Sequence, residues 1–534
     1  MFSWLYLPLV HLMYLWSTLN VPMTFLKLED RPFLEAVSKL AYANPFLPEM
    51  VNWEREALGA EFAQEETVWN FTVGDPERVH TNSWRIQGRL EKLIPQLRRS
   101  LAEGVRPTPK ELSLYEDALL YRFYFAYYER MNEAAFQKTP QALSRWAFYR
   151  EFRDEWRHYF EIPGIRMPPD NQARHTFACF YQILRAFHNI FPAIIGGSLP
   201  AARLRAAVWQ SVFTHDIRRY RRVLYARMNE FATLITGPSG TGKELVARSI
   251  AMSRYVPFDE KKLAFEAELD GLFYPINIAA LPGTLVESEL FGHRRGSFTG
   301  AVQDKRGWFE LCPELGAVFL DEIGELDPEI QVKLLRVIET RSFQPLGEGS
   351  GALQRFRGKL IAATNRNLPL TIGKKRFRED LYYRLCSDQI VTPSLRQQLD
   401  DSTRVLEDLV LFMSVRIAGE DGPAIAKQAL AWIKVNLPAD YAWPGNYREL
   451  EQCLRNFLIR REYAPFQVAE PVRARDPFAE AREGALTAEE LLCRYCRLVY
   501  KQTGSYEETA RRLRLDRRTV KAKVVSADAS RLRT

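Results

Sequence analysis

The residues best suited to chemistry form a glycine-rich loop, Gly237-Pro238-Ser239-Gly240-Thr241-Gly242-Lys243, followed by Glu244. A buried-strand pattern over 231–236 leads into the loop, and a helical pattern over 244–252 leads out of it. Glycines let backbone N–H groups approach phosphate closely, the helix N-terminus adds positive potential, and Lys243 reaches the β- and γ-phosphates. The sequence therefore predicts a nucleoside triphosphate site formed by residues 237 to 244.

Two adjacent carboxylates, Asp321 and Glu322, end a second buried-strand pattern. The general phosphate-loop motif has Ser or Thr after its lysine, and because Glu244 stands there, Mg²⁺ must depend on another residue. We expect Asp321 to hold Mg²⁺ through water and Glu322 to orient and polarise the attacking water. The alternative, two acids that merely cap a strand, is disfavoured by the phosphate loop.

Further polar and basic residues are suited to sensing or stabilising charge on the nucleotide. Thr364 and Asn365 follow a third strand pattern and are suited to report on the γ-phosphate. Arg378 and Arg384 lie six residues apart, and an arginine supplied across a subunit boundary accelerates phosphoryl transfer by orders of magnitude. Arg448, in a later helical region, is expected to contact the nucleotide. An ordinary surface salt bridge is the alternative for each arginine taken alone.

Residues 230–460 resemble the AAA+ domain of bacterial enhancer-binding proteins, the activators of sigma-54 RNA polymerase. The similarity lies in the order and spacing of long motifs: the phosphate loop with its Glu244, Glu289-Leu290-Phe291-Gly292-His293, the segments 296–301, 320–326, 362–366 and 377–385, and Trp443 to Leu450. The resemblance implies ATP as the nucleotide, Mg²⁺ as its cation and a homo-oligomer, expected as a hexamer. It also implies that Asn277 restrains Glu322 until the γ-phosphate is sensed.

The segment Gly296-Ser297-Phe298-Thr299-Gly300-Ala301 resembles the loop with which this family grips sigma-54. Glycines at both ends permit a mobile loop, and Phe298 is expected as an exposed apolar tip that a partner covers. The chain departs from the family's pattern at Ser297, which replaces the usual Ala, at the basic pair Arg294-Arg295, in an insertion near 257–273, and at Pro393-Ser394-Leu395-Arg396.

The C-terminal residues 486–534 are basic and have helix-turn-helix features. Leu513, Leu515, Val520 and Val524 are suited to a small core, and Asp516 to the N-cap of the second helix. We expect Arg517, Arg518 and Lys521 to enter the major groove of double-stranded DNA, and Arg511 and Lys523 to contact phosphates. The pattern resembles the Fis-type domain common at the C-terminus of this family, with Arg514 where the turn usually has Gly. A bare basic helical tail is the alternative.

The N-terminal part is read as helix after helix. In 112–136, apolar and aromatic residues recur at three- and four-residue spacing, and the strands of a phospho-acceptor receiver domain are missing from the pattern. Its aromatic residues either line a ligand pocket or, as the commoner case, fill a core. Before it, Met1 to Leu26 carries no charged residue. This segment is either a membrane anchor or a start-site artefact, with translation beginning at Met23.

Composition sets wider limits. A chain of 534 residues predicts several domains, and a net charge of +8 favours a polyanionic partner without choosing among DNA, RNA and a membrane surface. Six scattered cysteines fit a reducing cytoplasm, and the spacing of the histidines and cysteines predicts no structural metal.

The sequence therefore predicts a multidomain protein with an all-α N-terminal domain, an α/β AAA+ P-loop ATPase core with a helical lid, and a C-terminal helix-turn-helix. The expected boundaries are a hydrophobic segment 1–28, a regulatory domain 29–205, an ATPase subdomain 206–395, a lid 396–465, a linker 466–485 and a DNA-binding domain 486–534. The expected function is a cytoplasmic, ATP-dependent transcriptional activator that binds upstream DNA and remodels closed promoter complexes of sigma-54 RNA polymerase. The alternatives are an AAA+ remodeller of another client and a DNA-binding repressor that uses ATP to oligomerise.

Overall fold

The computed structural model describes residues 25–63, 81–136, 145–167, 172–347, 353–402, 404–465 and 486–525. The chain divides into two compact units, Met1–Arg461 and Glu462–Thr534, which are taken separately below. Residues 1–24 of the predicted hydrophobic segment and the predicted linker 466–485 lie outside the described residues. Within the described ranges, no helix is both long and apolar enough to cross a membrane.

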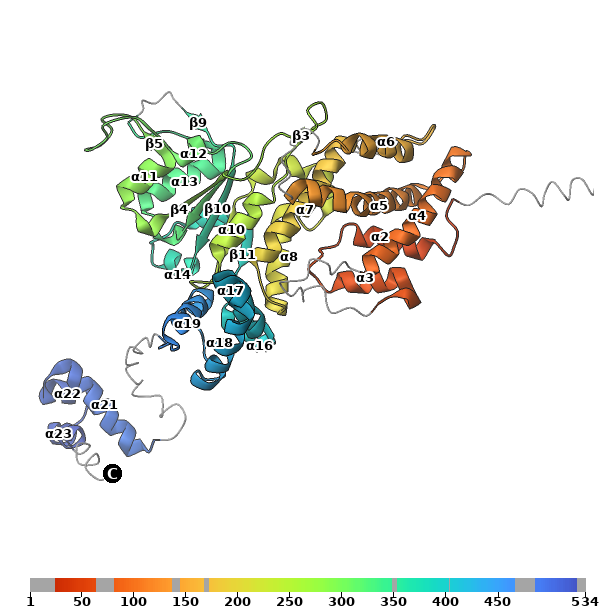
Figure 1. Ribbon diagram of the computed structural model, residues 1–534. Helices are drawn as coiled ribbons and strands as arrows, with labels where there is room; N and C mark the ends of the chain where they lie inside the picture. Colours follow the sequence, from red (N-terminus) through yellow and green to blue (C-terminus); the bar gives the residue numbers. More distant parts are fainter. Residues whose placement is uncertain are drawn as a thin grey trace, which may run out of the picture. The chain divides into compact units, whose positions relative to one another are not determined.

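The N-terminal part is helical, as the sequence predicted (Figure 1). Its aromatic residues form a continuous core: Tyr115, Phe123, Phe152 and Phe177 are fully buried, and the rings of Phe123 and Phe152 meet edge to face at 5.4 Å. Aromatic pairs of this geometry stabilise beyond their burial. The helices are α2 (Arg31–Leu40), α3 (Glu49–Leu58), α4 (Thr81–Ala102), α5 (Pro109–Phe136), α6 (Tyr149–Phe160), α7 (Ala173–Ala193), α8 (Leu199–Phe213) and α9 (Ile217–Arg222).

The middle of the chain forms a five-stranded parallel sheet in the order β11-β1-β10-β7-β4. Helices cover the sheet, which explains why its central strands are read as continuous apolar runs rather than as alternating patterns. The three strands predicted from the sequence are confirmed as β1, β7 and β10. The strands are β1 (Thr233–Thr236), β4 (Phe273–Asn277), β7 (Ala317–Asp321), β10 (Lys359–Thr364) and β11 (Asp388–Val391).

Helices and short hairpins complete this α/β part. The helices are α10 (Lys243–Met252), α11 (Gly283–Phe291), α12 (Trp308–Leu311), α13 (Pro328–Thr340), α14 (Leu368–Gly373) and α15 (Glu379–Leu385). The hairpins pair β2 (Phe258–Asp259) with β3 (Ala264–Phe265), β5 (Gly292–His293) with β6 (Lys305–Arg306), and β8 (Ser342–Phe343) with β9 (Gln354–Arg355). The lid that follows consists of α16 (Leu395–Asp401), α17 (Arg404–Ala418), α18 (Gly422–Asn436) and α19 (Asn446–Arg460).

The helical and α/β parts share one hydrophobic core. Helices α7 and α8 lie between the remaining N-terminal helices and the sheet (Figure 1), and Ile190 of α7 and Val212 of α8 belong to the same buried cluster as Val246 and Ile250 of α10. The boundary predicted between residues 205 and 206 falls inside α8. The change from a helical to an α/β pattern therefore does not coincide with a break in packing.

The predicted insertion near 257–273 contains the hairpin β2–β3, which docks on the helical part. Phe258 packs 4.8 Å from the ring of Phe177, and Phe265 stacks at 4.0 Å on Tyr181. The sequence identified the insertion as a departure from a family pattern and gave no reason for it. Its two phenylalanines attach the α/β part to the N-terminal helices.

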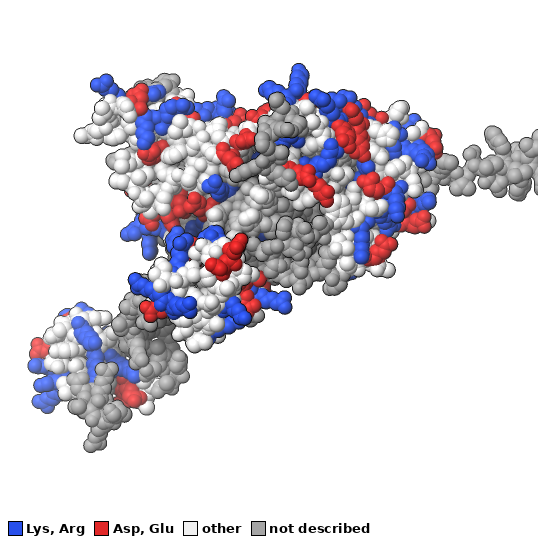
Figure 2. Space-filling model, viewed as in Figure 1, with Lys and Arg blue, Asp and Glu red and all other residues white. Residues whose placement is uncertain are grey.

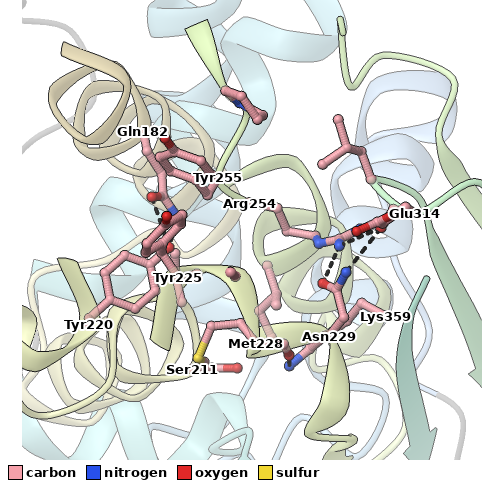
Figure 3. A pocket seen from close by; sticks show the side chains of 15 residues that line it. Gln182, Ser211, Tyr220, Tyr225, Met228, Asn229, Arg254, Tyr255, Glu314 and Lys359 are labelled. Atoms are coloured by element: carbon pink, nitrogen blue, oxygen red, sulfur yellow. Dashed lines mark hydrogen bonds between the residues drawn. The ribbon is translucent and has the colours of Figure 1, made fainter. Parts of the chain in front are cut away.

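Hydrogen bonds reinforce this junction around a small cavity of about 160 Å³, shown in Figure 3. Gln182 of α7 donates to the Tyr220 hydroxyl at 2.7 Å and to the Ser253 carbonyl at 2.9 Å. The buried Arg254 guanidinium donates to the Asn229 side chain and to the Glu314 carbonyl. Because each donor reaches an acceptor from another element, the bonds tie α7, α10 and the start of the sheet together.

The C-terminal unit is a group of three helices, α21 (Ala488–Thr503), α22 (Tyr506–Leu513) and α23 (Arg517–Val525). Val520 is fully buried, whereas Leu513, Leu515 and Val524 are half-buried. The predicted cap is confirmed, because a carboxylate oxygen of Asp516 accepts from the Arg518 N–H at 2.8 Å.

Candidate functional site

A cavity of about 480 Å³ lies at the carboxyl ends of the sheet strands and collects most of the predicted nucleotide residues. The loop after β1, the end of β7 and the end of β4 all open into it, as expected where parallel strands deliver their carboxyl ends to one edge. Its lining includes Ser239, Gly240, Thr241, Gly242, Lys243, Glu244, Asn277, Asp321, Glu322 and Arg448.

The phosphate loop has the backbone of a phosphate cradle. Gly237, Gly240 and Gly242 have φ values of 149°, 76° and 85°, a region that L side chains rarely adopt. A Cβ on Gly240 would lie 2.2 Å from the Gly445 carbonyl oxygen, and one on Gly237 would lie 2.1 Å from the Thr392 hydroxyl. Glycine is therefore required at both positions by space as well as by conformation.

Lys243 opens α10 and lies inside the loop that it follows. Its Nζ donates to the carbonyls of Gly237 and Pro238, each at 3.1 Å, and burial lowers the pKa of its ammonium group while Glu322 and Asp321 oppose that shift. An ammonium group held only by carbonyls at the N-terminus of a helix fits a phosphate ligand. The residues present therefore fit a triphosphate.

The carboxylate pair lies at the end of β7, opposite the loop. Burial raises the pKa of Asp321, while the Glu322 N–H, which donates to it at 3.0 Å, opposes the shift. Glu322 has a φ of 56°, a strained conformation for this residue type that is common at functional sites. Carboxylate oxygens that line a cavity together with a phosphate loop are ligands that fit Mg²⁺.

Asn277, which the family resemblance implies as the residue that restrains Glu322, is not hydrogen-bonded to Glu322 in this structure. Asn277 ends β4, pairs with Asp321 in the sheet register and lines the cavity. The Glu322 carboxylate instead accepts from the backbone N–H of Asn365 at 3.2 Å, and no hydrogen bond between Asn277 and Glu322 occurs among the described residues. The link from β10 to the Glu322 carboxylate thus runs through a backbone amide.

Thr364 does not present its hydroxyl to the nucleotide. The side chain is fully buried, and its oxygen accepts from the Arg366 N–H at 3.1 Å. Thr364 therefore shapes the turn that places the Asn365 N–H beside Glu322. This outcome differs from the prediction that its side chain reports on the γ-phosphate.

The lid contacts the phosphate loop through the turn before α19. Asn446, with a φ of 52°, donates from its side chain to the Ser239 carbonyl at 2.9 Å and accepts from the Leu395 N–H at 2.8 Å. The Tyr447 N–H donates to the Gly240 carbonyl at 3.1 Å, and Arg448 reaches the Ser239 hydroxyl at 3.4 Å. Arg448 is therefore at the nucleotide cavity, as predicted.

An apolar wall completes the cavity and was missed by the sequence analysis. It consists of Pro192, Ala193, Ile194, Ile195 and Leu204, from the end of α7 and from α8. The two isoleucines stand directly before Gly196-Gly197. An apolar pair followed by glycines was the available signal, and it is too common to identify a site.

The two predicted trans-acting arginines lie outside this cavity. Arg378 is bonded to Asp380 at 2.6 Å, and Arg384 is bonded to Glu339 at 3.0 Å with 59% of its side chain exposed. Surface ion pairs of this kind are weak. Both guanidinium groups are therefore on the surface of the subunit and held by partners that a stronger anion can replace.

The segment 296–301 is the tip of the hairpin β5–β6. The Gly296 N–H donates to the Ala301 carbonyl at 2.9 Å and closes the loop, with φ values of 80° at Gly296 and 102° at Gly300. Phe298 is half-buried, with its ring 4.9 Å from that of His293. The expectation of an exposed apolar tip is met only in part, because the hairpin shelters one side of its own phenylalanine.

Ser297 and the two basic residues have local explanations. The side chain of Ser297 faces Gly347, where an added Cβ would lie 2.5 Å from the Ser297 Cβ. The Arg295 N–H donates to Asp304 at 2.8 Å, and Arg294 lies 3.4 Å from the same carboxylate. Asp304 thus partly neutralises the basic approach to the loop.

The C-terminal unit displays a basic surface, and Figure 2 shows Lys and Arg side chains gathered on it. Ion pairs join Arg511 to Glu508 at 2.7 Å and Arg517 to Glu507 at 2.9 Å, and Lys523 pairs with Glu489. Arg518 and Lys521 are exposed and have no ion-pair partner in the described part of the chain. Of the five predicted DNA-contacting residues, these two are therefore the ones that no ion pair among the described residues occupies.

Comparison with known proteins finds one family model that matches part of the chain. Residues 211–391 match the family model described as the Sigma-54 interaction domain. The Nif-specific regulatory protein of Azotobacter vinelandii is 40% identical over 229 residues, which are 43% of this chain and 40% of that protein. The regulatory protein LuxO of Vibrio cholerae is 37% identical over 243 residues, 46% of this chain and 49% of that protein. The chain thus matches less than half the length of these curated relatives.

Among solved structures, NtrX from Brucella abortus in complex with ATP is similar, with a TM-score of 0.38 and 22% identity over 67% of this chain and 77% of that one. NtrX in complex with ADP gives a TM-score of 0.37 at 22% identity, over 67% and 76% of the two chains.

Proposed function

We propose, from the premise that residues 211–391 belong to the sigma-54 interaction domain family, that this protein is an ATP-dependent activator that remodels sigma-54 RNA polymerase. The observation that carries the proposal is a single cavity that joins the phosphate loop, the Asp321–Glu322 pair and Arg448. A binding site alone would need only the loop. Carboxylates placed against it are what hydrolysis requires.

In this proposal the chain's own groups divide the work. Backbone N–H groups of the phosphate loop and Lys243 bind the phosphates of ATP, and Asp321 holds Mg²⁺, which neutralises charge developing on them. Glu322 orients and polarises the attacking water, and Arg384 and Arg378 of a neighbouring subunit stabilise the transferred phosphoryl group. The assembly is a homo-oligomer, expected as a hexamer.

The conformational change that accompanies hydrolysis is transmitted to the partner through the β5–β6 hairpin. The hairpin pairs with the segment around Leu346, since the Arg294 N–H donates to the Leu346 carbonyl at 2.9 Å. A change at the end of β7 or β10 moves this pair of loops and presents Phe298 to sigma-54. The C-terminal unit binds upstream double-stranded DNA through Arg517, Arg518 and Lys521.

The test is complex formation between the full-length protein and sigma-54 in the presence of ADP and aluminium fluoride, which mimic the hydrolysis transition state. We expect a stable complex by size-exclusion chromatography. Phe298→Ala should abolish the complex while ATP turnover stays within about twofold of the wild type, because Phe298 is not among the residues that line the nucleotide cavity.

Val302→Ala is the matched control, because Val302 is an apolar residue of the same hairpin and 78% exposed. It should leave the complex intact. Active ATP turnover without any complex would mean that the protein is an AAA+ remodeller of another client. ATP binding without turnover would favour a repressor that uses the nucleotide to oligomerise.

A further inference from the structure

The helical N-terminal part contains a second cavity, of about 670 Å³, away from the nucleotide residues. It is bounded by α5 on one side and by α7 and α8 on another, and its size is within the range of small-molecule sites. Many apolar side chains that line it are only half-buried, among them Tyr124, Phe125, Tyr128, Ile183, Phe187 and Phe191. Apolar surface left open in this way is suited to a ligand that covers it.

Trp209 of α8 gives this cavity a polar feature. The residue lines the cavity and is 3% exposed, with its ring 5.1 Å from that of Phe187. Its indole N–H is buried without a hydrogen-bond partner among the described residues. A buried donor left unpaired costs about 1–3 kcal/mol, so an acceptor brought by a ligand would be bound favourably.

The charges around the cavity are already matched or lie at its rim. Arg221 lines it and donates to the buried Glu116 at 2.8 Å. His188 stacks on Phe136 at 3.8 Å, and burial lowers the pKa of its imidazole, which favours the neutral form. Glu129 is exposed. The interior is therefore mainly apolar. Besides the Trp209 N–H, the Tyr121 hydroxyl lines it without a hydrogen-bond partner among the described residues. Such an interior accepts a neutral ligand with an acceptor and disfavours a charged one.

We propose that this cavity binds an uncharged aromatic small molecule carrying a hydrogen-bond acceptor, and that binding is coupled to the nucleotide cavity through the end of α7. Phe191 and Pro192 line the aromatic cavity, and Pro192 with Ala193 and Ile194 lines the nucleotide cavity. One rigid helix thus forms a wall of both sites. The proposal concerns binding to this chain and does not depend on which partner the ATPase remodels.

The experiment uses two probes of similar shape, 2-acetylnaphthalene, which has a carbonyl acceptor, and 2-ethylnaphthalene, which has none. Binding to the full-length protein is measured by titration calorimetry. We expect saturable binding of both, with the ketone bound more tightly. Trp209→Phe should weaken ketone binding about tenfold, the equivalent of one lost hydrogen bond, and should leave 2-ethylnaphthalene unchanged.

Two further variants make the result specific. Trp432→Phe, in α18 of the lid, removes an indole N–H elsewhere and should change neither affinity. Ile183→Trp fills the cavity and should abolish binding of both probes while the circular dichroism spectrum remains that of the wild type. Ketone binding that survives Ile183→Trp, or that is equal in the wild type and Trp209→Phe, would overturn the site. Binding that is observed only after removal of residues 1–22 would also overturn the site, because that segment would then be the occupant of the cavity.

The coupling is measured by repeating the titrations with a saturating non-hydrolysable ATP analogue. Linkage requires the analogue to change ketone affinity by the same factor by which the ketone changes analogue affinity. A reciprocal change of at least about fivefold is expected. Identical affinities with and without the second ligand would overturn the coupling.

Discussion

Asp321 must be ionised to hold a cation, yet it lies where ionisation is unfavourable. Burial raises the pKa of its carboxyl group, so the folded protein without ligands binds this proton more tightly than the unfolded chain does. A carboxyl group with a raised pKa contributes stability at low pH that is lost as pH rises through its folded-state pKa. At neutral pH, Asp321 therefore destabilises the protein that holds no ligand.

Asp321→Asn should accordingly raise the melting temperature of the nucleotide-free protein at pH 7.5, by roughly 2 °C for a domain of this size. The gain should shrink as pH falls toward the pKa of Asp321, because the wild-type carboxyl group is then neutral too. Scanning calorimetry between pH 5 and 7.5 measures the difference. Glu329→Gln, an exposed acid in the first turn of α13, is the control and should show no such trend. An Asn variant less stable than the wild type at neutral pH would contradict the burial argument.

At the scale of elements, the phosphate loop and the lid turn before α19 are in close contact. A Cβ on Gly240 would meet the Gly445 carbonyl at 2.2 Å, whereas Gly271, with a similarly positive φ of 85°, has nothing within 4 Å. Both Gly→Ala changes impose a left-handed conformation that costs about 1–2 kcal/mol. Only Gly240→Ala also pushes the lid away from the loop.

We therefore expect Gly240→Ala to lower ATP affinity at least about tenfold, since the lid turn that carries Arg448 is displaced. Gly271→Ala should lower the melting temperature slightly and leave ATP affinity unchanged. Equilibrium binding of a fluorescent ATP analogue to each variant gives the comparison. Equal affinities of the two variants would show that the lid does not support the loop.

In the turn between α22 and α23 of the C-terminal unit, a substitution is expected to stabilise rather than to destabilise. Arg514 ends α22 with a φ of 53° and a ψ of 43°, a conformation that glycine adopts without strain. Arg514→Gly should stabilise the unit by about 1 kcal/mol and raise hydrogen-exchange protection of the α22 and α23 amides about fivefold. Arg512→Gly places the same change inside α22, where glycine is unfavourable by about 1 kcal/mol, and should lower that protection. A loss of protection in Arg514→Gly would mean that its side chain, rather than its backbone, supports the turn.

Local chemistry explains which elements the sequence could predict. The strands that lead to Gly237, Asp321 and Thr364 are short apolar runs followed by polar residues, so their positions could be predicted. Because parallel strands deliver their carboxyl ends to one edge of a sheet, the approach of these polar residues to one another could be predicted as well. The burial of Thr364 and the bond from the Asn365 N–H to Glu322 depend on the course of one turn, and residue types do not fix that course.

Over the whole molecule, the unpredicted features lie where parts meet. The β2–β3 hairpin and the apolar wall from α7 depend on residues far apart in sequence, such as Phe177 with Phe258, and a single sequence does not reveal such pairs. The aromatic residues of the N-terminal part were assigned mainly to a core. They form that core, and some of them also line the cavity of about 670 Å³, so packing in a core and lining a cavity do not exclude one another.

The position of Arg384 leads to a prediction about the assembly as a whole. Its guanidinium is on the surface, paired with Glu339, whereas Glu322 lines the nucleotide cavity of the same subunit. If hydrolysis needs Glu322 from one subunit and Arg384 from its neighbour, Glu322→Gln and Arg384→Ala should each reduce ATP turnover at least about a hundredfold while ATP still binds. Each variant alone is inactive for a different reason.

Mixing the two variants should then restore turnover. A site in an Arg384→Ala subunit keeps Glu322, and it receives an intact arginine when its neighbour is a Glu322→Gln subunit. In a random equimolar mixture about a quarter of the subunit boundaries have this arrangement, so turnover should reach about a quarter of the wild-type rate. Phosphate release measured across mixing ratios should peak at equal amounts. A mixture no more active than its components would mean that Arg384 acts within its own subunit or not at all, and the ring would lose its catalytic role.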